Sequence, residues 1–206
     1  MKLWIPAFLS GAVCASLLLG ARAPSVPPGP QDKPGAEDMA AMMAKAAKYT
    51  QPGEHHKLLE RFLGKWDTAS RITMAGENTE WEKGTSEVTW LMEGRWLQSK
   101  GTGSMMGMPV QFFSVMGYDS FKQSYVATSV NSLDTAMSRS EGDMDPGGKA
   151  LLLYGTIDEY LTGEHDKMVK YVWRLVSDDK VVMEVHDLPI GETNTKVIEV
   201  VSTRKK

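Results

Sequence analysis

Cysteine is nearly absent from this 206-residue chain, whose single cysteine, Cys14, lies in an apolar stretch near the N-terminus. The rest of the sequence therefore has no thiol for a disulfide, a nucleophile or a metal thiolate. The formal charge is only −3, which gives no basic footprint, so we expect no nucleic-acid partner. Gly-x-Ser-x-Gly, phosphate-loop and dinucleotide-binding motifs are also missing, and with them the sequence support for three large enzyme classes.

Residues 1–23 have the pattern of a secretory signal peptide. Lys2 is followed by a long apolar run and then by the small-x-small cleavage pattern of Ala21 and Ala23. We therefore expect an exported protein, periplasmic or extracellular. Cleavage after Ala21, cleavage after Ala23 and an uncleaved leader all stay open, because Pro24 directly follows the second site. Membrane contact is expected only if the leader is uncleaved.

Two further segments precede the main domain. Residues 24–35 contain five prolines, which predicts an extended linker. Residues 36–49 carry methionine and alanine at helical spacing, which predicts a short amphipathic helix. A second short helix is expected over 54–63, ending at Gly64. We assign residues 50–206 to one domain.

That domain reads as consecutive strands. Beyond Gly64, short runs rich in Val, Tyr, Trp and Thr alternate with turn residues, and no useful helical period occurs among them. We predict strands at residues 66–74, 79–83, 86–92, 95–101, 109–118, 123–130, 137–143, 150–158, 167–176, 181–187 and 195–204. Short consecutive hairpins favour a mostly β fold: a single antiparallel up-and-down β-barrel of about ten strands, with one or two short N-terminal helices.

The barrel interior is the first place to expect a ligand. Alternation along strand 137–143 places charged residues outward and the small Ser138 and Ser140 inward. A barrel of about ten strands is also wider than the eight strands that side chains just fill. We therefore predict an internal cavity and name Ser138 and Ser140 as ligand-lining residues. Met106, in a turn at a barrel mouth, and His186, on a strand, complete this set.

Several patterns resemble metal sites, but each has a simpler explanation. His55 and His56 are adjacent on a helix, so their side chains point about 100° apart and cannot share an ion. Methionines at 105–108 suit Cu(I) in an exported protein, yet they equally suit an apolar turn. His186 has no second histidine nearby for haem ligation, and residues 143–147 lack the glutamate that completes a calcium loop. We predict no metal and no cofactor.

Several segments, in order, resemble one bacterial family. Gly64-Lys65-Trp66, at the start of the first strand, is similar to the Gly-x-Trp signature of calycins. The other matching segments are 52–58, 105–109, 117–119, 142–155, 158–163 and 182–205. Over roughly residues 39–206 the chain resembles the family known as domain of unknown function 1579. The resemblance implies a lipocalin-like barrel and no assigned activity.

The same resemblance implies structural roles. In calycins a tryptophan of the first strand packs beneath a basic residue of the last strand. Gly64, Trp66 and Arg204 are therefore the expected structural signature, with the Arg204 side chain within about 6 Å of the Trp66 ring. His56 is expected to cap its helix or to seat it on the barrel. His186 stands where the family usually carries a tyrosine.

The leading functional hypothesis is a carrier or sensor that binds a small, mostly apolar ligand inside the barrel. A barrel enzyme, hydrolase or isomerase, with its site at the mouth is the first alternative, although no catalytic residue is predicted. A structural or partner-binding module that uses the helix at 36–49 is the second. An open cavity with a few polar groups favours the first hypothesis, and a closed, dry interior favours the last. The oligomeric state is left open.

Overall fold

The computed structural model describes residues 35–74, 76–159, 163–188 and 195–206. The signal peptide predicted at 1–23 and nearly all of the linker predicted at 24–35 lie outside these residues. Contacts divide the chain into a unit of residues 1–40 and a unit of residues 41–206. Every strand lies in the second unit.

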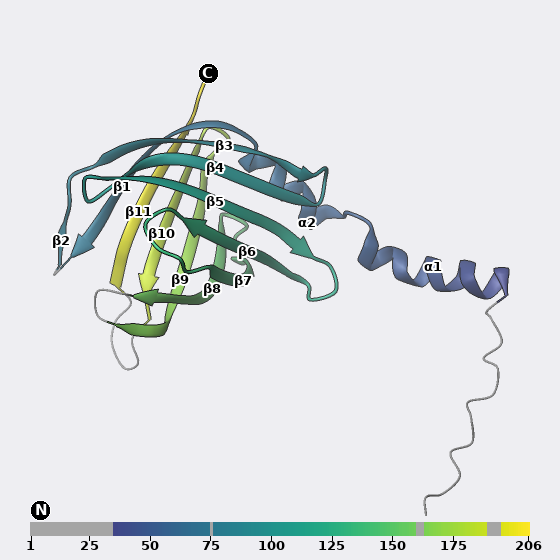
Figure 1. Cartoon of the computed structure of the whole chain (residues 1–206). Helices are drawn as coiled ribbons and strands as arrows, with labels where there is room; N and C mark the ends of the chain where they lie inside the picture. Colours follow the sequence, from purple (N-terminus) through teal and green to yellow (C-terminus); the bar gives the residue numbers. More distant parts are fainter. Residues whose placement is uncertain (1–34, 75, 160–162, 189–194) are drawn as a thin grey trace, which may run out of the picture. The chain divides into compact units, whose positions relative to one another are not determined.

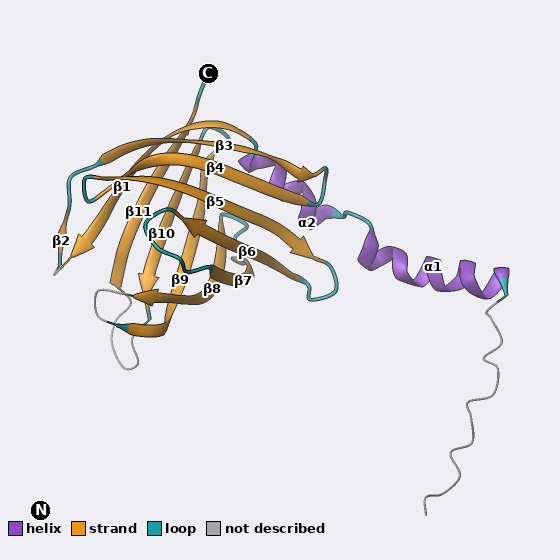
Figure 2. Ribbon diagram, viewed as in Figure 1, coloured by secondary structure: helices purple, strands orange, loops and turns teal. Residues whose placement is uncertain are grey.

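Helical segments occur only before the first strand in the described part of the chain (Figure 2). Helix α1 spans Ala36–Thr50, where the sequence predicts a helix over 36–49. The helix predicted over 54–63 is instead an α-helical turn, α2 (Glu54–Lys57), followed by a 3₁₀ helix, η1 (Leu58–Phe62). A 3₁₀ helix aligns residues three apart, so Leu59 and Phe62 share one side, and both are buried. None of these described helices is long and apolar enough to cross a membrane.

Eleven strands follow in the described residues, and ten of them close a barrel (Figure 1). Their bounds are β1 (Gly64–Met74), β2 (Glu77–Asn78), β3 (Glu82–Met92), β4 (Trp96–Met105), β5 (Met108–Asp119), β6 (Ser124–Asn131), β7 (Ser138–Met144), β8 (Ala150–Glu159), β9 (Glu164–Ser177), β10 (Lys180–Asp187) and β11 (Thr195–Arg204). From β3 onward each strand pairs antiparallel with the next, and β1 pairs with both β3 and β11. Strand β2 pairs with β1 outside the ring. The predicted antiparallel up-and-down barrel of about ten strands is confirmed.

The sequence prediction has two strands, at 79–83 and 86–92, where the structure has one continuous strand, β3, over Glu82–Met92. Gly84 lies within this strand. A Cβ atom at Gly84 would lie 2.6 Å from the carbonyl oxygen of Thr102 and 3.0 Å from the Cα of Gly103. Gly84 therefore serves the close approach of β3 and β4 rather than a turn.

The hydrophobic core gathers at one end of the barrel, which we call the closed end. Here β1 begins, β11 ends, and η1 packs on the strands. The buried side chains of this core include Leu59, Phe62, Trp66, Leu97, Tyr118, Tyr125, Leu151 and Leu153. We call the opposite end, with the β4–β5 and β6–β7 connections, the open end. Side chains fill the closed end, so free interior space is expected toward the open one.

Candidate ligand-binding site

The predicted pairing of Trp66 with Arg204 joins the first and last strands at the closed end. The two residues are direct partners in the β1–β11 ladder, and the guanidinium carbon lies 4.2 Å from the centroid of the indole ring. The indole Nε1 donates a 2.9 Å hydrogen bond to the carbonyl of Phe62, which ties the ring to η1. Gly64, with φ of 119°, leaves the room that Arg204 occupies, because a Cβ there would lie 2.7 Å from Nη1. The predicted approach of the Arg204 side chain to within about 6 Å of the Trp66 ring is therefore confirmed.

Arg204 also satisfies carbonyl groups that the end of η1 leaves without partners. Its Nη1 donates to the carbonyl of Leu63, and its Nη2 donates to that of Arg61 at 3.0 Å. Its Nε donates to the carbonyl of Asp178 at 3.0 Å, and the Asp179 carboxylate lies 3.2 Å away. One side chain thus joins η1, the β9–β10 turn and the last strand.

His56 seats the preceding turn on the barrel, as predicted. Its Nδ1 accepts a 3.0 Å hydrogen bond from the backbone N–H of Gly53, and its ring hydrogen-bonds to the backbone of Tyr118. The side chain of His55 points elsewhere and stacks on the Tyr118 ring, with centroids 4.3 Å apart. The hydroxyl of Tyr125 donates to the His55 carbonyl at 2.9 Å. The two histidines therefore have separate structural roles.

The burial of His56 predicts a loss of stability in mild acid. Burial lowers the pKa of His56 below its ordinary value of 6.5. The folded protein thus binds this proton less readily than the unfolded chain, and the free energy of unfolding falls as the pH drops below 6.5. His56→Asn keeps an acceptor near the Nδ1 position and is expected to remove this component. Urea titrations between about pH 5 and pH 7.5 measure it.

His165→Asn is the matched control, because the His165 side chain is 84% exposed. It should keep the wild-type pH dependence. The assignment to His56 fails if His56→Asn and wild type lose stability in parallel as the pH falls.

A cavity of about 390 Å³ lies inside the barrel and reaches from the closed end to the open end. Phe62 and Trp66 form its floor, and Met105 and Leu133 lie at its open end. The remaining wall comes from inward-facing residues of β1, β3, β4, β5, β6, β9, β10 and β11. The interior is thus a ligand-sized space rather than a filled core.

One wall of the cavity carries a row of serines. Ser99 of β4 pairs with Ser114 of β5, Ser114 pairs with Ser129 of β6, and Ser129 pairs with Ser138 of β7. Adjacent strands set these residues about 4.8 Å apart. The row ends in a hydrogen bond, because the Ser129 and Ser138 hydroxyls lie 2.6 Å apart. We call Ser99, Ser114, Ser129 and Ser138 the serine row, of which the first three line the cavity.

The wall across the barrel is mostly apolar. It comes from β9, β10 and β11, which lie on the far side of the ring from β5 and β6. Its apolar side chains are Trp173, Val181, Met183, Val185, Ile198 and Val200, and the hydroxyl-bearing Tyr171 and Ser202 of the same strands also line the cavity. The cavity therefore offers a row of hydroxyl groups on one side and a mostly apolar surface on the other.

Asp134 is the one charged side chain among the described residues that line the cavity. It lies in the β6–β7 connection at the open end. Its carboxylate accepts a hydrogen bond from the Asn131 amide at 3.0 Å and another from the backbone N–H of Ala136 at 3.0 Å. These two donors hold the carboxylate in place at the mouth.

Four residues are expected from the sequence to line a ligand site: Ser138, Ser140, Met106 and His186. None of them is among the described residues that line the cavity. Ser138 and Ser140 are half-buried on the inward face, whereas Ser129, which is hydrogen-bonded to Ser138, does line the cavity. Met106 is 49% exposed in the β4–β5 turn. His186 faces outward, since alternation turns Met183 and Val185 inward and a bulge follows. Contact of these four residues with a ligand stays an untested prediction.

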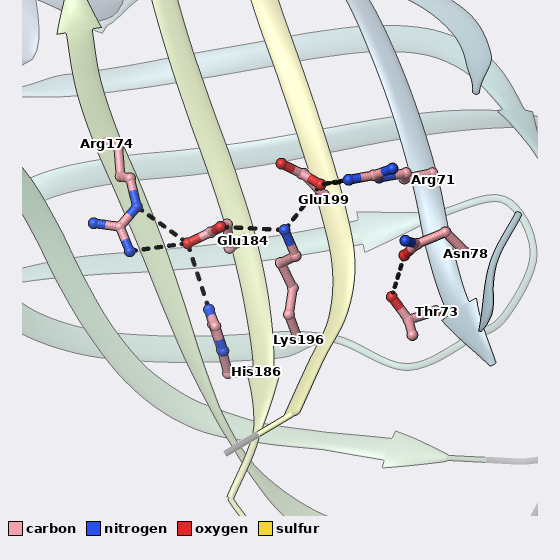
Figure 3. Close-up of polar contacts among 8 residues, drawn as sticks. All are labelled: Arg71, Thr73, Asn78, Arg174, Glu184, His186, Lys196 and Glu199. Atoms are coloured by element: carbon pink, nitrogen blue, oxygen red, sulfur yellow. Dashed lines mark hydrogen bonds and ion pairs between the residues drawn. The ribbon is translucent and has the colours of Figure 1, made fainter. Parts of the chain in front are cut away.

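On the outer face, His186 belongs to an ion-pair network (Figure 3). Glu184 accepts from Arg174 at 3.1 Å and lies 3.5 Å from His186 Nε2. Lys196 joins Glu184, at 3.4 Å, to Glu199, at 2.9 Å. Burial raises the pKa of Glu184, but the charges of Arg174 and Lys196 and the His186 hydrogen bond outweigh it and leave that pKa lowered. The network links β9, β10 and β11, and each of its two carboxylates is paired with at least one cation of the same network.

A second concavity, about 680 Å³, lies on the outer surface of β3 to β6. Thr85, Lys100, Gln111 and Phe113 are among its lining residues, and we call it the outer groove. It is wide open to water, whereas strands surround the interior cavity. Enclosure favours the interior, because a ligand there loses far more of its exposed surface. Among the described residues no group of three or more His, Cys, Asp or Glu side chains is placed to hold a metal ion.

Solved structures of other proteins share this barrel fold. Rv2717c from M. tuberculosis aligns with a TM-score of 0.56 at 11% identity, over 76% of this chain and 100% of its own. The S-type phycobiliprotein lyase CPES from Guillardia theta gives a TM-score of 0.48 at 11% identity, over 78% of this chain and 96% of its own. At 11% identity the likeness to Rv2717c shows the fold alone.

Sequence comparison gives the family directly. No curated protein matches the chain. The profile of one family, described as "Protein of unknown function (DUF1579)", matches residues 51–204, which covers the barrel and the turn that seats it. The chain therefore belongs to the DUF1579 family of proteins of unknown function.

Proposed function

We propose that this protein binds a small, largely apolar molecule inside its barrel. The observation that carries the proposal is the 390 Å³ interior cavity. Ligand pockets in proteins commonly measure about 300–1,000 Å³, with mostly apolar walls and a few placed polar groups. The apolar wall of β9 to β11, the serine row and Asp134 fit that description.

Binding is proposed in preference to catalysis because of the chemistry of the lining. Its described polar groups are hydroxyls, the Asn131 amide and the Asp134 carboxylate. No histidine and no second carboxylate is among these lining residues, so they contain no acid–base pair. The cavity supports a carrier or a sensor.

We also propose that the protein acts outside the cytoplasm. The support is the leader pattern of residues 1–23, with its lysine, apolar run and small-x-small end. N-terminal sequencing of protein recovered from the periplasm or the medium tests this proposal. A start at Arg22 or Pro24 identifies cleavage after Ala21 or Ala23, and an intact leader on cytoplasmic protein contradicts it.

Titration with N-phenyl-1-naphthylamine, an uncharged apolar fluorophore, tests ligand binding. We expect saturable fluorescence enhancement at one probe per chain. Ser114→Phe places a ring in the cavity from the middle of the serine row, and it is expected to weaken binding about tenfold or more. The probe should also quench or shift tryptophan emission, because Trp66 and Trp173 line the same space.

Gln111→Phe is the matched control, since it adds the same ring to the same strand but on the exposed outer face. It should leave probe affinity unchanged. The proposal is contradicted if the probe shows no saturable binding, or if Gln111→Phe weakens binding while Ser114→Phe does not. Far-UV circular dichroism of both variants verifies that the barrel is intact.

A further inference from the structure

The polar groups of the cavity restrict what kind of ligand head it accepts. Serine and threonine hydroxyls both donate and accept hydrogen bonds, so the serine row is compatible with either kind of partner. A carboxylate only accepts. No lysine, arginine or histidine is among the described lining residues, so nothing there pairs with an anionic ligand head. The charge of the lining is therefore of one sign.

Asp134 has acceptor capacity left for a ligand. An ionised carboxylate offers about four lone-pair sites, and the Asn131 amide and the Ala136 N–H use one on each oxygen. Both donors also orient the group, which lies beside Leu133 at the open end of the cavity. A head group that enters with its apolar body toward Trp173 comes to rest near this carboxylate.

Glu82 adds a second carboxylate at the open end. It pairs with Ser70, which lines the cavity, and alternation places it on the same face as Gly84 and Ser86. Its Oε1 accepts from the backbone N–H of Gly107 at 3.1 Å. Its Oε2 is buried and has no hydrogen-bond partner among the described residues. Such an atom is costly unless a donor reaches it.

We infer that the ligand is an amphiphile with a cationic amine head, bound with that head at Asp134 and with its apolar body against the β9–β11 wall. A carboxylic acid of the same shape is disfavoured, because its head would face like charge without any paired cation. This inference rests on the proposed function and gives it a ligand class.

Three probes that differ only in the head group test it: dodecylamine, dodecanol and dodecanoic acid. Each competes with N-phenyl-1-naphthylamine at neutral pH, below the concentration at which it forms micelles. We expect the amine to bind at least about tenfold more tightly than the acid, with the alcohol between them. Asp134→Asn keeps the shape of the side chain and is expected to reduce the amine-to-acid preference about tenfold or more while changing dodecanol little.

Asp158→Asn is the control for general electrostatics. It removes the same charge at the same end of the barrel, from a side chain that is 52% exposed, and should keep the wild-type preference. The inference is overturned if the acid binds as tightly as the amine, or if the preference survives Asp134→Asn. Wild-type protein alone decides the first point, so a poorly folded variant does not leave the inference untested. Failure of all three compounds to displace the probe overturns the proposed function as well.

Discussion

Replacing Arg204 with alanine is expected to lower the free energy of unfolding by about 3 kcal/mol. The guanidinium lies 4.2 Å from the Trp66 ring centroid and donates to the carbonyls of Leu63, Arg61 and Asp178. A hydrogen bond from a charged donor contributes about 1.5–3 kcal/mol, and a cation–π contact about 0.5–2 kcal/mol. The contributions are not additive, and water satisfies part of what is lost, so the total lies well below their sum.

Urea unfolding followed by tryptophan emission measures this loss. Lys205→Ala is the control, because Lys205 is the next residue and its pair with Asp67, at 3.1 Å, is exposed on both sides. Exposed pairs contribute about 0–1 kcal/mol. Arg204→Lys should fall between the two, since one ammonium cannot reach three carbonyls. A loss under about 0.5 kcal/mol for Arg204→Ala would contradict the role given to this side chain.

Leu59→Ala is expected to cost about 3 kcal/mol by opening a void beneath η1. Leu59 is completely buried and packs in the closed-end core with Phe62 and Tyr125. Removing three carbon atoms from such a site loses their transfer free energy and leaves space that a closed barrel cannot easily collapse. Leu91→Ala is the matched control, because Leu91 is 45% exposed, and it should cost less than about 0.5 kcal/mol. Similar losses in both variants would show that η1 is not part of the core.

The fold was predictable because its signals are local. Alternation, turn residues and the absence of a helical period specify consecutive antiparallel strands, and closure follows from the need to remove edges. The division of β3 was wrong, and the role of Gly84 within that strand could not be predicted because it depends on the neighbouring strand β4. A glycine required by a neighbouring strand looks, in sequence, like a glycine required by a turn.

The sequence predicted that the barrel holds a cavity, but it did not predict which residues line that cavity. Ser138 and Ser140 point inward as alternation predicts, yet Ser129 lines the cavity and these two residues do not. Cross-strand register decides which inward residue reaches the ligand, and a one-residue error in any turn changes it. The even spacing of Ser99, Ser114 and Ser129 is a usable signal, because successive hairpins of similar length place equally spaced residues side by side.

No sequence pattern identified Asp134 as a cavity residue. It lies between strands, where a carboxylate is ordinarily solvated, and nothing nearby shows that its connection borders the cavity. Arg204 and Trp66, by contrast, are about 138 positions apart, and the resemblance to calycins still paired them correctly, in agreement with a closed barrel whose first and last strands are neighbours. A long-range contact implied by a family resemblance was thus easier to predict than a loop side chain at the mouth.

Anomalous diffraction from crystals grown with a bromine-labelled dodecanol tests the central claim most directly, because it locates the ligand without relying on any variant. The account predicts a bromine peak inside the barrel, between the serine row and the wall that holds Trp173 and Met183. A peak confined to the outer groove beside Lys100 and Gln111, or no interior peak at saturating ligand, would contradict it.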